Sequence, residues 1–134
     1  MALLLLAACG PYPRDTAGTV ERIERTGTLH AGLVAGTADP AAAKALTRQA
    51  ARQWQAKVAW RTGSASALLQ QLEAGEVDLV VGEWARSSPL GNEVSLSAAI
   101  ASAEPSDAQE PALRLARKPG ENRLVTATDT LVLQ

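Results

Sequence analysis

The order of apolar segments along the chain is the feature that most restricts its fold. Three short runs rich in Val, Leu and Ala, at 28–34, 57–61 and 77–82, are separated by segments in which apolar residues recur at helical spacing. An alternation of strands and helices with short links is typical of a parallel sheet with right-handed crossovers. The sequence therefore predicts an α/β fold with three layers, α/β/α, and a mostly parallel sheet in which the 28–34 strand is central.

The first two helices are bounded by capping residues. The first is expected over Thr16–Thr26, with Gly27 as its stop. The second has Asp39 as its N-cap and Pro40 at its first helical position, and it continues to about Ala56. Both segments place their apolar residues on one face.

The third helix precedes the most apolar strand. Ser64 or Ser66 can cap it, and Gly75 ends it before the strand at 77–82. Its apolar face is predicted to pack on the sheet and carries Ala65, Leu68, Leu69 and Leu72.

The C-terminal part has weaker patterns. Glu83–Glu93 is expected as a polar loop, Val94–Leu96 as a brief strand, and Ala98–Pro111 as a low-complexity linker. Ala112–Arg117 alternates apolar and polar residues, which predicts an edge strand, and a last helix starts near Glu121.

Composition excludes several classes of function. The net charge is −1 and there is no basic run, so nucleic acid is not an expected partner. A single Cys excludes an internal disulfide and a Cys-rich metal site. His30 stands alone and is expected to be a surface or packed residue, and no phosphate-binding glycine loop is present. We therefore expect no metal, no cofactor, no catalytic residues and no enzymatic activity.

The N-terminus carries a processing signal. Residues 1–8 form a short apolar run that ends in small residues, directly before Cys9. Residues 6–9, Leu-Ala-Ala-Cys, resemble the bacterial lipobox, which implies a signal peptide over 1–8 and lipid on the Cys9 thiol. Residues 9–18 would be the lipidated Cys and a Pro-rich tether, followed by one lobe over 19–134. A buried structural Cys is the alternative interpretation, and the run has no Lys or Arg before it.

Three segments resemble the bacterial family-3 extracellular solute-binding proteins, two-lobed receptors of amino-acid ABC importers. Residues 19–33 are similar to the family's opening helix and strand. Residues 68–82, which read LLQQLEAGEVDLVVG, resemble its most specific signature, and 116–122 are similar to the segment that returns into the first lobe. The resemblance implies one lobe of a type II periplasmic binding protein.

The chain departs from this family at the places that hold a ligand. The family's second lobe is inserted where only residues 98–111 stand here. The family's first lobe commonly supplies Thr and Arg for the ligand's carboxylate, whereas Ala85 takes the Thr-like place and Leu90–Glu93 contains no base. Glu83, Trp84 and Arg86 are the candidate ligand-binding residues, although a surface loop with one half-buried Trp explains them as well.

Two hypotheses follow for the function. In the first, the chain is a membrane-anchored solute-binding-like lipoprotein on the periplasmic face of the cell envelope. Its partners would be an ABC permease, the membrane through the lipid, and a weakly bound, amino-acid-like small molecule. In the second, it is a structural or interaction lipoprotein that keeps one lobe as a scaffold without small-molecule binding.

Overall fold

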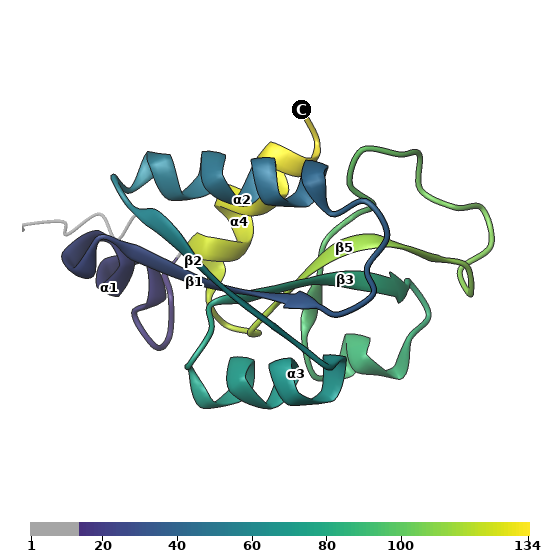
Figure 1. The fold of residues 1–134 in the computed structure, drawn as a ribbon, viewed down its shortest axis with the longest axis horizontal. Helices are drawn as coiled ribbons and strands as arrows, with labels where there is room; N and C mark the ends of the chain where they lie inside the picture. Colours follow the sequence, from purple (N-terminus) through teal and green to yellow (C-terminus); the bar gives the residue numbers. More distant parts are fainter. Residues whose placement is uncertain (1–13) are drawn as a thin grey trace, which may run out of the picture.

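The computed structural model describes residues 14–134, which form a five-stranded sheet with helices on both faces (Figure 1). The strand order is β2-β1-β3-β5-β4. The strands are β1 (Thr28–Val34), β2 (Lys57–Gly63), β3 (Leu79–Ala85), β4 (Ser95–Leu96) and β5 (Pro111–Arg117). β1 pairs in parallel with β2 and β3, so the predicted central strand is confirmed, and β5 is antiparallel to both β3 and β4.

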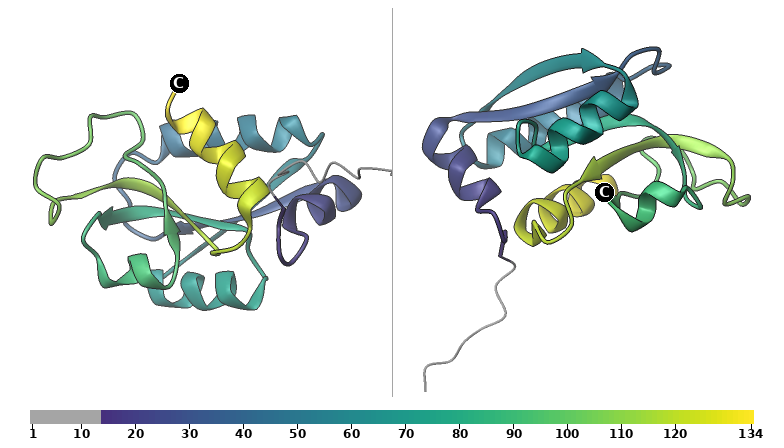
Figure 2. Two further views of the ribbon diagram at one scale, coloured as in Figure 1. Left: turned by 180° about the vertical axis from the view of Figure 1, so that it is seen from behind. Right: turned by 90° about the horizontal axis from the view of Figure 1, so that it is seen from below.

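The helices divide into two layers. α2 (Ala41–Gln53) and α4 (Asn122–Val132) cover one face, and α1 (Thr19–Thr26) lies at its end. Figure 2 shows α4 lying across this face, where it contacts both α1 and α2. α3 (Ala65–Ala74) and the 3-10 helix η1 (Pro89–Asn92) cover the other face. The predicted three-layer fold is therefore confirmed.

Each face of the sheet has its own apolar core. On the α2/α4 face, Leu29, Leu79 and Leu115 are fully buried among helix residues. On the α3 face, Leu68 and Leu72 pack with Val80 and Trp84. Leu69, expected to face the core, is only partly buried at the margin of this second cluster.

Local capping explains where α3 lies. The Ser64 hydroxyl accepts a hydrogen bond from the Ala67 N–H at 3.2 Å, which confirms one of the two predicted caps. Gly75 ends the helix with φ +79°, a left-handed conformation that a side chain would strain. For α2 the predicted cap is wrong, because Pro40 takes the N-cap position without a side-chain bond and Asp39 is exposed with φ +43°.

The predicted end of the third strand and the predicted edge position of the strand at 112–117 are also wrong. The polar loop was expected to start at Glu83, but β3 continues to Ala85 because β5 pairs with it along its whole length, with Trp84 opposite Ala112. β5 itself is not the edge strand that its alternation predicted, since the two-residue β4 covers its other side.

The segment before α1 is fixed to the end of the chain. One Asp15 carboxylate oxygen accepts the Val20 N–H at 2.7 Å, and the other accepts the N–H groups of Arg123 and Leu124 at 2.7 and 3.1 Å. One side chain thus satisfies free N–H groups at the start of both α1 and α4. In the other direction, the carboxylate of Glu121 accepts a hydrogen bond from the Ala17 N–H. Part of the expected tether therefore packs on the lobe, and α1 starts at Thr19 and not at Thr16.

The expected linker is irregular but attached. Residues 98–110 contain no helix or strand, yet Ala99 and Ile100 are buried. The Ser97 and Ile100 N–H groups donate to the carbonyls of Leu115 and Leu113, both at 2.9 Å. We call residues 97–110 the 97–110 loop. This loop continues the hydrogen bonding to the outer side of β5 beyond the end of β4.

Candidate functional site

The candidate site lies at the carboxyl edge of the three parallel strands. β1, β2 and β3 end at Val34, Gly63 and Ala85, and in open α/β sheets ligands bind outside such ends. The 97–110 loop reaches the same side of the molecule (Figure 1). It is attached there by the Ser87 N–H, which donates to the Ala108 carbonyl at 2.9 Å.

The three candidate ligand-binding residues do not form one cluster. Glu83 and Trp84 lie within β3, so their side chains point to opposite faces of the sheet. Glu83 is exposed, whereas Trp84 is 7% exposed and belongs to the core on the α3 face. Arg86 follows the strand and its side chain is half-exposed. Their role in ligand binding stays a prediction.

Arg86 belongs to a cluster of charged residues that also contains Glu104 and Arg114. Glu104 of the 97–110 loop lies between two guanidinium groups, those of Arg86 and Arg114. The Arg86 Nη1 is 3.7 Å from Glu104 Oε1, while Arg114 binds the same carboxylate through both of its terminal nitrogens, one of them at 3.1 Å. The hydrogen bonds from Arg114, together with one from the Ala99 N–H, hold the pKa of Glu104 below its usual range.

Arg114 is the buried member of this cluster. Its side chain is 2% exposed, on the middle of β5. Its Nε donates to the Trp84 carbonyl at 2.8 Å and its Nη1 donates to the Ser97 carbonyl at 3.1 Å. Two backbone oxygens therefore fix the plane of the guanidinium independently of its carboxylate partner.

A cavity of about 580 Å³ lies beside this cluster. We call it the Arg114 pocket. Both guanidinium-bearing residues and Glu104 line it, together with η1, β4 and adjoining residues Gly91, Val94, Ser95, Leu96, Ser97 and Ala98. Its volume is in the range of small-molecule sites.

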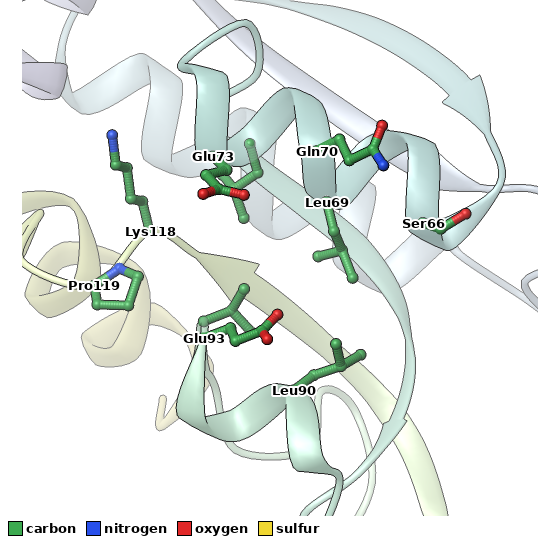
Figure 3. Close-up of a pocket in the computed structure, with 10 residues that line it drawn as sticks. Ser66, Leu69, Gln70, Glu73, Leu90, Glu93, Lys118 and Pro119 are labelled. Carbon is green, nitrogen blue, oxygen red and sulfur yellow. The ribbon is translucent and has the colours of Figure 1, made fainter.

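A second cavity of about 580 Å³ separates α3 from η1. Figure 3 shows Leu69 of α3 and Leu90 of η1 extending toward each other across it. Glu73, Glu93 and Lys118 supply its charges. No guanidinium group lines this cavity.

The other buried charges have structural partners. Asp78, expected as a turn residue at the end of a strand, is buried and accepts the His30 N–H at 2.8 Å. Burial raises the pKa of Asp78, although Arg22 beside it acts in the opposite direction. Arg117 is fully buried and binds the Thr128 hydroxyl at 2.8 Å and the Asp129 carboxylate. Among residues 14–134 no group of His, Cys, Asp and Glu has the arrangement of a metal site.

Sequence reasoning missed Arg114 and Glu104. Arg114 occupies a polar position in an alternating strand, which normally faces solvent, and Glu104 lies in a segment without periodicity. The one available signal was the presence of two arginines in a strand that is otherwise apolar. The lipidation candidate Cys9 lies outside the described residues. Within residues 14–134 no helix has the length and hydrophobicity needed to cross a membrane.

Several solved structures have a similar fold, and two of them are a single domain of the protein TmArgBP. Domain 1 from TmArgBP, in its arginine-bound form, matches with a TM-score of 0.65 and 14% identity, over 84% of this chain and 96% of that one. A point mutant of the same domain matches with a TM-score of 0.69, also at 14% identity, over 85% of this chain and 95% of that one.

Larger proteins match over a smaller part of their length. EhuB in complex with hydroxyectoine has a TM-score of 0.51 at 17% identity, over 65% of this chain and 37% of that one. The periplasmic domain of BvgS from B. pertussis has a TM-score of 0.51 at 15% identity, over 67% of this chain and 20% of that one. No protein-family model and no curated protein matches the sequence. The chain thus has the fold of a single lobe of a periplasmic solute-binding protein.

Proposed function

We propose that the chain is a solute-binding-like lipoprotein, held by lipid at Cys9 to the periplasmic face of an envelope membrane and associated with an ABC-type transport system. It offers the carboxyl edge of its sheet to an amino-acid-like small molecule. The observation that carries this proposal is the Arg114 pocket, whose lining includes Arg86 at the carboxyl end of the parallel strand β3.

The absence of a second lobe from the described residues is compatible with this role. A cleft between two lobes buries most of a ligand's surface, which argues against tight binding by one lobe alone. Domain 1 from TmArgBP, which this chain matches over nearly all of its length, is nevertheless described in an arginine-bound form. A lobe of this fold is thus a reasonable receptor for one amino acid.

The affinity is expected to be low. Arg86 and Arg114 already bind Glu104, and Ala85 offers no hydroxyl beside them. An ion pair with the half-exposed Arg86 contributes about 0–1 kcal/mol, and a ligand that pairs with Arg114 must first replace Glu104. Since 1.4 kcal/mol is about tenfold in affinity, a ligand held by such contacts dissociates in the millimolar range.

Calorimetric titration with a panel of amino acids tests the binding role. We expect saturable millimolar binding of at least one amino acid by the monomer. No saturation by any of them would contradict the role in solute binding, and micromolar binding would contradict the argument from an open edge.

The anchor is tested separately. We expect the protein to fractionate with membranes, because two or more acyl chains anchor stably whereas one is marginal. Cys9→Ser should move it to the soluble fraction and remove the lipid mass from the mature N-terminus. If this variant associates with membranes as strongly as the parent protein, lipid attachment at Cys9 is contradicted.

One observation favours the second hypothesis, a structural or interaction lipoprotein without small-molecule binding. Glu104 of the chain itself occupies the guanidinium groups that would receive a ligand. Permease and ATPase genes beside this one would favour the transport role over the scaffold role.

A further inference from the structure

Arg114 has the properties of a prepared carboxylate receptor. Its Nε and one bond of its Nη1 go to backbone carbonyls at 2.8 and 3.1 Å, which belong to the sheet and to the end of β4. Both terminal nitrogens also donate to the Glu104 carboxylate. The orientation of the guanidinium is therefore set by the lobe, and the carboxylate that it binds is a separate component.

Glu104 is the exchangeable component. It comes from the irregular 97–110 loop, and its side chain is 30% exposed, in contrast to the 2% of Arg114. Beyond Arg86 and Arg114, the Ala99 N–H is the group that the carboxylate binds, at 2.9 Å. A carboxylate on such a loop can leave without moving the strand that carries Arg114.

Charge and space both allow a carboxylate from outside. Two guanidinium groups share one carboxylate, so the cluster has a net charge of about +1. The Arg114 pocket, of about 580 Å³, opens beside it, and the half-exposed Arg86 lies at the pocket's lining.

We propose that Arg86 and Arg114 form a binding site for the carboxylate group of a small molecule, and that Glu104 is a resident competitor which the ligand displaces. This inference rests on the proposed function, and it names the chemical group that the ligand must carry and the residues that receive it.

An internal competitor lowers the apparent affinity. The observed Kd is the intrinsic Kd divided by the fraction of molecules in which the site is free. A carboxylate tethered by a short loop has an effective concentration of about millimolar or more. If Glu104 occupies the site in about nine of ten molecules or more, the free fraction is about 0.1 or less, so removal of its charge should strengthen the binding of an external carboxylate by at least about tenfold.

Acetate is the probe, and acetamide, which has a similar shape and no charge, is its control. Glu104→Gln keeps an oxygen for the Ala99 N–H and removes the charge. Glu110→Gln is the matched control, an exposed glutamate of the same loop. Binding is followed by the NMR resonances of the Arg86 and Arg114 side-chain Nε–H groups during titration.

In Glu104→Gln we expect saturable shifts of the Arg114 resonance with acetate, at a Kd at least tenfold below that of the parent protein. Glu110→Gln should behave like the parent, and acetamide should leave both resonances unchanged. Equal acetate affinity in Glu104→Gln and parent, or equal shifts with acetamide, would overturn the proposal.

If Glu104→Gln does not fold, the parent protein still decides the matter. High acetate should then shift the Arg114 resonance and the Glu104 carboxylate resonance together, because one replaces the other, and Arg86→Gln should weaken this effect. Shifts at Arg86 alone would overturn the proposal. The amino-acid titration of the parent is independent, so a failed proposed function is distinguishable from a failed carboxylate site.

Discussion

Replacement of Asp15 tests how firmly the start of the lobe is held. Its carboxylate accepts N–H groups from the first turns of α1 and α4, at 2.7 Å from Val20 and at 2.7 and 3.1 Å from Arg123 and Leu124. A single capping side chain contributes about 0.5–2 kcal/mol. Asp15 caps two helices and is 9% exposed, so Asp15→Ala should cost about 3 kcal/mol.

Urea unfolding followed by circular dichroism at 222 nm provides the measurement. The midpoint should fall while the slope stays constant, because the amount of surface exposed on unfolding does not change. The melting temperature should fall by about 10 °C for a domain of this size. Asp15→Asn, which keeps one acceptor oxygen, should show an intermediate loss.

Asp107→Ala is the matched control. The Asp107 carboxylate also accepts a backbone N–H, that of Gln109 at 2.8 Å, but in an exposed turn of the 97–110 loop. This variant should lose no more than about 0.5 kcal/mol, as for most surface substitutions. If Asp15→Ala loses no more than Asp107→Ala, the double cap does not stabilise the lobe.

The remaining predictions concern the ion pair between Arg22 and Asp78 and the packing of the sheet against α3. Arg22→Ala leaves the Asp78 carboxylate buried without its cation, so it should cost about 1–3 kcal/mol at pH 7. Since burial raises the Asp78 pKa, Asp78 favours folding most below its unfolded pKa and this contribution fades as the pH rises through the folded pKa. The Arg22→Ala loss should therefore shrink in acid, and urea titrations that show the same loss at pH 4 and pH 7 would contradict this. Gly82→Ala places a methyl group 2.8 Å from the Trp84 ring, so thermal melting should report a loss of about 1–3 kcal/mol, and an unchanged melting curve would contradict the close packing. Leu68→Asp should prevent folding because Leu68 is 1% exposed, whereas the same change at the partly buried Leu69 should leave a folded protein by circular dichroism.

The helices and strands that sequence patterns predicted correctly are those whose limits are set by residues close in the sequence. β1 agreed at both ends with its predicted limits, since Gly27 and a turn bound an apolar run. Ser64 and Gly75 defined α3 because capping depends on residues within one turn. The parallel order of β2, β1 and β3 followed from the handedness of short crossovers.

The elements that sequence patterns missed depend on distant partners. β3 continues through Glu83 and Trp84 because β5, about thirty residues later, supplies the pairing strand. Propensity in strands is a weak guide where such pairing decides. Arg114 is buried because the Trp84 carbonyl, thirty residues earlier, and the carboxylate of an irregular loop satisfy it, and Asp15 caps a helix that begins more than a hundred residues away. None of these partners is visible in a local window.

The attachment of the 97–110 loop to β5 has a consequence for the self-association of this protein. The β4 strand is only two residues long, so the N–H groups of Ser97 and Ile100 occupy carbonyls of β5 that a full strand would occupy. If the loop leaves, those carbonyls become free at the side of the sheet, where another chain could add a strand. Variants that loosen Glu104 would then aggregate at concentrations that the parent tolerates, and light scattering would detect this before any loss of helix signal.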